Sequence, residues 1–228
     1  MRLPSSALLL LLSALALGLT GCQSENVPAP GTKNYEKAVS AFFTGVSALQ
    51  VGQNYRAEQE LKTAAKVAPG EPAVWVNRGL LAAQRNELST AAARFERARS
   101  LAPNNPTIHL LSGILARERG RYEQAIDHFR RVVELDSTNA PGLYALAQVI
   151  EQRGGDTALT DALGLVTRLL AQHPNNLAVL VERARLAAKA GRKKTLRESL
   201  KQLSRRASSW PKPVRSSLQK VQNLADTP

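Results

Sequence analysis

The sequence predicts an all-α fold built from repeated helix pairs, and three observations support this expectation. Alanine and leucine are abundant, whereas aromatic residues make up only 4% of the 228 residues, a balance that favours helices over a β-sandwich. Glycine recurs at intervals of 34 residues, at Gly45, Gly79 and Gly113. Within residues 122–132, apolar side chains follow one another at spacings of three and four, which is the period of one helix face. A period of this length indicates helical units that bury their apolar faces by stacking.

The composition excludes several classes of function. With 43% hydrophobic and 21% charged residues, the chain resembles a folded protein rather than a disordered one. A single cysteine rules out an intramolecular disulfide and a cysteine-rich metal site, and three histidines disfavour a metal site built from imidazole alone. The sequence has no glycine-rich phosphate loop, no His-Glu-x-x-His pair and no Gly-x-Ser-x-Gly elbow. We therefore expect a binding protein and not an enzyme, with no metal and no cofactor.

The N-terminus has the features of a secretion signal. A positive charge at Arg2 precedes an apolar run over residues 7–17, which is short for a bilayer-spanning helix of about 20 residues. The run ends in Leu19-Thr20-Gly21-Cys22, and this segment resembles the lipobox of bacterial lipoproteins. The alternative is a transmembrane anchor with an incidental cysteine.

The resemblance implies that residues 1–21 are a signal peptide and that Cys22 carries a diacylglyceryl thioether and, usually, a palmitate-like acyl group on its amine. Two or more acyl chains hold a protein stably at a membrane, so the membrane is an expected partner. In lipoproteins sorted by the residue after the cysteine, aspartate is the retention signal. Gln23 stands there, which favours the outer membrane, facing the periplasm, over the inner membrane.

The segment after the cysteine is predicted to be a linker. Residues 23–33 lack helical periodicity and contain proline and glycine. We therefore expect residues 22–37 to form the lipidated cysteine and a flexible tether that joins the membrane to the folded part.

The 34-residue period extends beyond the glycines. It is shared by prolines, alanines and large apolar residues, namely Pro69 and Pro103, then Ala57, Ala91 and Ala125, then Leu61, Phe95 and Phe129. This pattern resembles the tetratricopeptide repeat (TPR), a helix-turn-helix of 34 residues with small residues at repeat positions 8 and 20. The resemblance implies a TPR solenoid of about four to five repeats over residues 38–210. A closing helix and tail are expected over residues 211–228.

The repeat frames follow from this register. They cover residues 38–71, 72–105, 106–139, 140–176 and 177–210. The fourth frame is longer, with the excess in the turn at residues 154–157, and the fifth matches the pattern only weakly. Gly52, Gly120, Gly154 and Gly191 are expected to end first helices, where a left-handed backbone is needed.

The resemblance also implies where a partner binds. In TPR arrays the first helices line a concave groove, and the matching residues here are Phe42, Val46, Leu49, Val76, Leu80, Leu110, Ile114, Tyr144 and Gln148. These predict a groove for other envelope proteins or peptides that is apolar at its N-terminal end and basic, through Arg185 and Lys189, at the other. The alternative is that Phe42, Val46 and Leu49 lie under the tether or pack between helices.

The net charge of +13 is concentrated near the C-terminus. Residues 177–228 contain 13 Lys and Arg against 3 Asp and Glu, whereas residues 23–176 contain 17 against 15. The densest basic patch consists of Arg192, Lys193, Lys194, Arg205 and Arg206. Outside the cytoplasm such a patch favours a cell-wall polymer, lipopolysaccharide or anionic lipid headgroups over nucleic acid. A generally solvated basic end is the alternative.

Four functional hypotheses remain. The leading one is a lipid-anchored TPR scaffold that positions other proteins at the cell envelope, with a layout similar to that of type IV pilus pilotins. In the second, the basic patch holds an envelope polyanion. In the third, the chain corresponds to the N-terminal TPR module of a larger type of secreted protein. In the fourth, a cytoplasmic helical repeat binds RNA, which requires the lipobox interpretation to be wrong.

Overall fold

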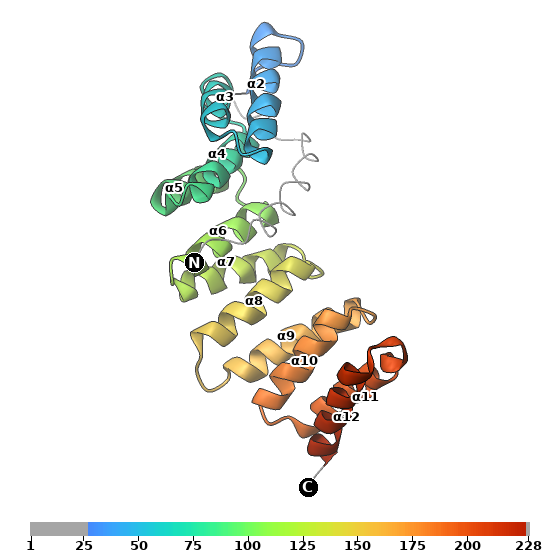
Figure 1. The fold of residues 1–228 in the computed structure, drawn as a ribbon. Coiled ribbons are helices and arrows are strands. Elements are labelled where there is room, and N and C mark those ends of the chain that lie inside the picture. The colour runs from blue at the N-terminus through green and yellow to red at the C-terminus, as the bar shows by residue number, and fades with distance from the viewer. Residues whose placement is uncertain (1–26, 227–228) are drawn as a thin grey trace. The chain divides into compact units, whose positions relative to one another are not determined.

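The computed structural model describes residues 27–226, and within them every regular element is helical (Figure 1). The described part contains eleven α-helices and one short 3₁₀ helix. In chain order they are α2 (Lys33–Gln50), α3 (Asn54–Val67), α4 (Pro72–Gln84), α5 (Leu88–Leu101), α6 (Pro106–Glu118), α7 (Tyr122–Leu135), α8 (Ala140–Arg153), α9 (Ala158–Gln172), α10 (Leu177–Lys189), α11 (Lys193–Ser204), η1 (Ala207–Ser209) and α12 (Lys212–Asp226). The prediction of an all-α fold of helix pairs is thereby confirmed.

The predicted signal peptide and Cys22 lie outside the described residues. The predicted tether, residues 22–37, extends into the described part. Its last residues, 33–37, are helical there and not flexible linker, because α2 begins at Lys33. The Thr32 hydroxyl accepts a hydrogen bond from the Tyr35 amide at 3.2 Å and caps this helix. Among residues 27–226, no helix is both long enough and apolar enough to cross a bilayer.

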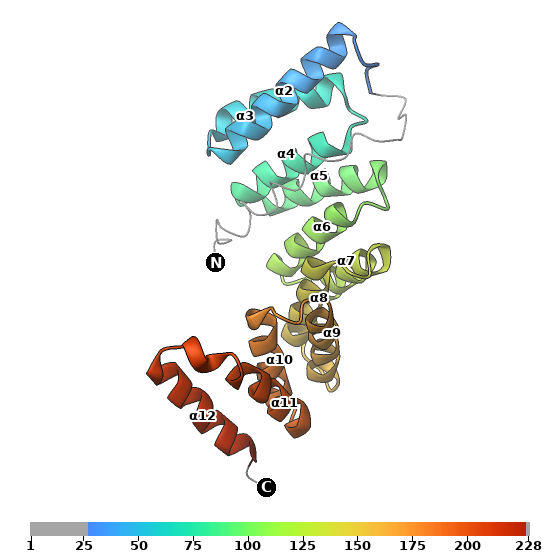
Figure 2. The same ribbon diagram turned by 90° about the vertical axis from the view of Figure 1, so that its right-hand side faces the viewer.

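The chain divides into two compact units, one ending at Leu115 and the other beginning at Ala116. In the N-terminal unit α2 packs on α3, α3 on α4 and α4 on α5, and the pairs α2–α3 and α4–α5 lie side by side in both views (Figures 1 and 2). The core of this unit combines Leu61 and Phe95 with small residues such as Ala57, Ala91 and Ala98. Small side chains at these positions let neighbouring helices approach closely.

In the C-terminal unit α7 packs on α8, α8 on α9, α9 on α10, α10 on α11 and α11 on α12. The weakly matching fifth repeat still forms a helix pair, because Leu180 of α10 and Leu200 of α11 are buried in the core of the unit. Leu218 of the closing helix α12 packs against this same core. The apolar face that the last helix pair would leave uncovered is therefore partly covered.

The helix ends follow a repeating pattern. The first helix of every pair begins with a side-chain cap, supplied by Thr32, Glu71, Asn105, Asn139 and Asn176. No side chain caps the second helices α3, α5, α7, α9 and α11. The turns within pairs instead use left-handed backbone at Gly52, Gly120, Gly154 and Gly191, as predicted. The second pair has Asn86 there, with a φ of 62°.

Candidate functional site

Most apolar residues predicted for the groove of the N-terminal unit are buried. Leu49, Val76, Leu80 and Leu110 are each less than a tenth exposed. The first three belong to the core of the unit, in which Ile108 and Leu111 of α6 also take part. These side chains therefore stabilise the stack of helices and offer no free surface to a partner. Phe42, Val46 and Ile114 are half-buried.

Phe43 was not among the residues predicted for the groove, yet it is the most exposed aromatic residue of α2. Phe43 is 55% exposed, and its ring lies edge-to-face on Phe42 with 5.5 Å between the ring centroids. The sequence carries a signal for it, because two consecutive residues of a helix point about 100° apart and cannot both face one core. Phe42 faces the core, and Phe43 faces solvent.

In the C-terminal unit, three large apolar side chains on first helices remain accessible, and Leu177 at the start of α10, which is 39% exposed, is one of them. Tyr144 of α8 is 38% exposed and Val181 of α10 is 48% exposed. Both occupy the fifth position of their repeats. Gln148, one turn along α8 from Tyr144, is half-buried and accepts a hydrogen bond from Nη1 of Arg117 at 3.1 Å. We call Tyr144, Gln148 and Val181 the first-helix face of the C-terminal unit.

An ion-pair network joins α8 to α10 beside this face. The Glu151 carboxylate accepts hydrogen bonds from both terminal nitrogens of Arg185 and from Nζ of Lys189 at 2.8 Å. Arg185 also donates to Glu182 through Nε at 2.8 Å. The hydrogen bonds from Arg185, with those from Lys189, lower the pKa of Glu151 to about 2 against the opposing effect of burial. The positive charges of Arg185 and Lys189 are thus compensated by carboxylates. This end of the groove is therefore not the free basic end that the sequence predicts.

The family assignment follows from the repeats themselves. The family model of the tetratricopeptide repeat matches residues 44–106 and 86–140. Residues 44–140 are tetratricopeptide repeats. The TPR helix pairs continue beyond the matched residues through α10 and α11, and the predicted TPR fold class is confirmed. A search among curated proteins found no relative.

Several solved structures share this TPR fold. PilF of Pseudomonas aeruginosa is 19% identical and has a TM-score of 0.66, covering 85% of this chain and 89% of PilF. MamA of Desulfovibrio magneticus RS-1 is 15% identical with a TM-score of 0.62, covering 84% and 98%. YrrB, described as a TPR protein with an unusual peptide-binding site, is 15% identical with a TM-score of 0.60, covering 83% and 91%. At these identities the likeness shows the fold alone.

The predicted basic patch is only partly free. Arg206 is half-buried and donates to the Pro174 carbonyl at 3.0 Å and to Oδ1 of Asn175 at 3.1 Å, so it holds a turn. Arg192, Lys193, Lys194 and Arg205 are exposed, although Arg192 also lies 3.4 Å from the Thr160 hydroxyl.

A regular basic stripe runs along α11 and ends at the residue after it, Arg205. Lys193, Arg197, Lys201 and Arg205 follow one another at intervals of four residues, and all four are exposed. Two of them, Arg197 and Lys201, were absent from the predicted patch because it was defined by adjacent charges in the sequence. The spacing of four would have found them, since residues four apart share a helix face. We call these four residues the basic stripe.

Proposed function

We propose that this chain is a lipid-anchored TPR adaptor of the bacterial cell envelope that binds a segment of another protein. The observation that carries the binding part is the exposure of Tyr144 and Val181 at the same repeat position on α8 and α10. Accessible apolar side chains bordered by polar ones are typical of interaction sites. TPR repeats are typically non-catalytic scaffolds for such binding, and the described YrrB site provides a precedent on the same fold.

The polar side chains that border this face are already held in fixed positions, which favours binding. Glu151, Arg185 and Lys189 hold one another in place across α8 and α10. Long side chains that are already fixed lose little conformational entropy when a partner docks beside them. The partner segment would place an apolar side chain between Tyr144 and Val181 and direct polar groups to Gln148.

The envelope part of the proposal rests on the resemblance of Leu19 to Cys22 to a lipobox. Only residues 23–32 separate that cysteine from α2, and ten residues span at most roughly 35 Å when extended. A lipid on Cys22 would therefore keep the TPR repeats close to the membrane surface. A role in assembling envelope or pilus machinery at the outer membrane is the specific form of this proposal.

Partner binding can be tested with a matched pair of tyrosines. The double variant Tyr144→Ala, Val181→Asp removes the apolar contacts, whereas Tyr122→Ala removes a tyrosine of the same exposure, 37%, from the second helix α7. In crosslinking and pull-down from cell envelopes, we expect the double variant to lose at least nine-tenths of the captured partner and Tyr122→Ala to retain it. Circular dichroism confirms that both variants are folded. An unchanged set of partners for the double variant would contradict the proposed face.

The lipid anchor is tested by Cys22→Ala. The variant should move from the membrane fraction to the soluble fraction, because its only site for acylation is removed. Gln23→Asp serves as the control, since it keeps the acylated cysteine and, by the lipoprotein resemblance, should move the protein to the inner membrane. If Cys22→Ala stays in the membrane with residues 1–21 attached, the anchor is an uncleaved helix and the lipoprotein proposal fails.

A second candidate function is supported by the basic stripe. Successive residues of the stripe are separated by about 6 Å along the helix axis, so the charges form a line that suits a linear polyanion of the envelope. The double charge reversal Lys193→Glu, Lys201→Glu should abolish co-sedimentation with anionic cell-wall polymer, and the unmodified chain should lose it at high salt. Binding that is unchanged at high salt and in the charge-reversal variant would exclude this function.

A further inference from the structure

The N-terminal unit contains a cluster of arginines around one tryptophan. Trp75 of α4 is held in place by a hydrogen bond from its Nε1 to the Pro69 carbonyl at 2.8 Å. The guanidinium carbons of Arg78, Arg94 and Arg97 lie 5.1, 5.5 and 5.9 Å from the centroid of its ring. Each distance is within the range of a cation–π contact. Three like charges are thereby gathered around one aromatic side chain.

These three arginines lack the close ion pairs that neighbouring Arg85 forms. Among residues 27–226, no carboxylate forms an ion pair with Arg78, Arg94 or Arg97. By contrast, Arg85 pairs with Glu58 at 2.6 Å and with Glu87 at 3.0 Å. Burial, followed by repulsion from Arg94, lowers the pKa of Arg78 below its usual range, and the attraction of Glu58 offsets only part of this effect. The free protein therefore holds positive charge here that a bound anion would stabilise.

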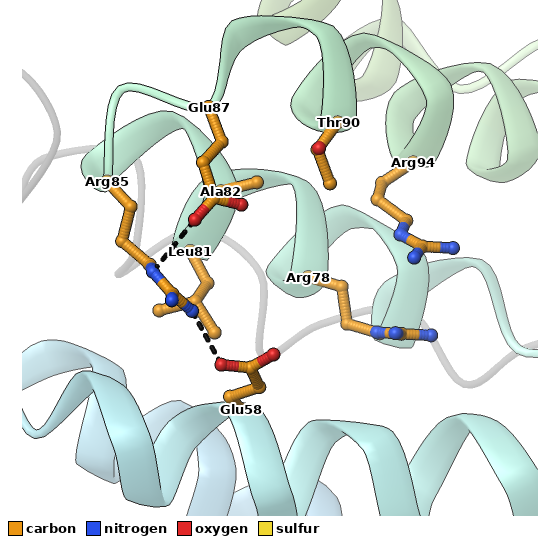
Figure 3. A pocket seen from close by; sticks show the side chains of 8 residues that line it. All are labelled: Glu58, Arg78, Leu81, Ala82, Arg85, Glu87, Thr90 and Arg94. Atoms are coloured by element: carbon orange, nitrogen blue, oxygen red, sulfur yellow. Dashed lines mark hydrogen bonds and ion pairs between the residues drawn. The ribbon is translucent and has the colours of Figure 1, made fainter.

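A pocket adjoins the cluster and is lined from α3, α4 and α5 (Figure 3). Its volume is about 60 Å³, which accommodates one small group and not a whole nucleotide. At one end the two acidic side chains, Glu58 and Glu87, are occupied by Arg85. Figure 3 shows the side chains of Arg78 and Arg94 extending together away from Arg85, with the Glu58 carboxylate between Arg85 and Arg78. Thr90 adds a hydroxyl to the lining.

We propose that Arg78, Arg94 and Arg97 form a binding site for a phosphate group beside Trp75. Guanidinium groups present planar sets of N–H donors that match the oxygens of a phosphate. Three cations approaching from different residues suit a dianionic, tetrahedral group better than a carboxylate, which is planar and carries one charge. The site is independent of the proposed protein-binding face, because all of its residues belong to α4 and α5 of the N-terminal unit.

The site can be followed by tryptophan fluorescence, because the chain has only two tryptophans. In the Trp210→Phe variant, Trp75 becomes the sole emitter. Titration with sodium phosphate should produce a saturable change in emission as the guanidinium groups shift from the ring toward the anion. Sodium chloride at the same ionic strength should not produce it. Calorimetric titration of the unmodified chain gives the same Kd without relying on the substitution.

Substitution of the arginines distinguishes a specific site from general attraction of anions to a basic protein. Adding Arg78→Gln or Arg94→Gln to the Trp210→Phe variant should weaken phosphate binding at least tenfold. Arg56→Gln removes the same charge from an exposed position on α3, a helix that contributes none of the three arginines, and it should leave the Kd unchanged. Equal responses to chloride and phosphate, or an unchanged Kd in the cluster variants, would overturn the proposal.

The source of the phosphate is identified by two probes. Saturable binding of inorganic phosphate supports a site for free phosphate or a small phosphomonoester. Arginine-dependent binding to phosphatidic acid vesicles, with no binding to phosphatidylcholine vesicles and none to inorganic phosphate, supports a site for a lipid headgroup. Failure with both probes overturns the site and leaves the protein-binding proposal unaffected.

Discussion

At the scale of single residues, the close approach of paired helices depends on glycines that face a large side chain. A Cβ atom added to Gly79 would lie 2.4 Å from Cε1 of Phe95, and one added to Gly45 would lie 2.8 Å from Cγ of Leu61. Phe95 and Leu61 are both buried, so neither can move aside freely. The TPR resemblance implied a small residue at repeat position 8, and these contacts give the steric reason for it.

Gly79→Ala should therefore destabilise the N-terminal unit. Overpacking of a core costs about 1–3 kcal/mol, and the gain in helix propensity from glycine to alanine, about 1 kcal/mol, offsets only part of it. Urea denaturation measures the net loss. Gly164→Ala is the matched control, because Gly164 is exposed on α9 and an added Cβ would meet nothing within 4 Å. That change should stabilise the protein by about 0.5–1 kcal/mol; a neutral Gly79→Ala would contradict the steric explanation.

At the scale of elements, the helices of the C-terminal unit are joined by both packing and charge. Leu180 and Leu200 connect α10 and α11 through the core, whereas Glu151 connects α8 to α10 at the surface. The side chain of Glu151 is 18% exposed, but that of Arg185 is 37% exposed. Solvent therefore weakens this ion pair, and the apolar contacts carry most of the stability.

The network predicts a defined pH dependence. Because the pKa of Glu151 falls from 4.5 to about 2 on folding, its contribution is present above the unfolded pKa and is lost as pH falls toward 2. The upper limit is about 3 kcal/mol, and screening of the exposed partner reduces it. Unfolding free energies of the unmodified chain and of Glu151→Gln should differ at neutral pH and converge near pH 2. A difference that persists undiminished at pH 2 would show that the charge of Glu151 is not responsible.

At the scale of the whole chain, stability is organised unit by unit, and the C-terminal unit depends on its closing helix. Leu218 of α12 packs on the core of that unit, and the Gln222 side chain donates to the Leu200 carbonyl at 3.3 Å. The N-terminal unit has a core of its own, with Leu61, Leu80 and Phe95 fully enclosed. Repeat proteins transmit stability mainly between neighbouring repeats.

Removal of residues 211–228 should accordingly act locally. Hydrogen exchange of amides in α10 and α11 should accelerate by at least tenfold, because the truncated chain exposes apolar surface that Leu218 covers. Amides in α4 and α5 should keep their protection and serve as the internal control. Equal acceleration in both places would show that the two units unfold together.

The parts of the fold that the sequence predicted are those set by local rules. The repeat period, the turns at Gly52, Gly120, Gly154 and Gly191, and the small residues at Gly45 and Gly79 follow from backbone conformation and helix spacing. The weak fifth repeat was harder to judge, because its helix pair is stabilised by leucines rather than by the family's usual residues.

The sequence by itself determined that this chain is a stack of TPR helix pairs, because periodicity and turn residues act within one repeat. Only the tertiary structure decided which side chains are available for binding. Val76 and Leu80 are enclosed by residues of other repeats, whereas Tyr144 and Val181 are not. Arg185 forms an ion pair with Glu151 across 34 residues, while Arg78 and Arg94 form none in the described part of the chain. Exposure and charge compensation depend on neighbours supplied by distant residues, and spacing along the chain does not specify them.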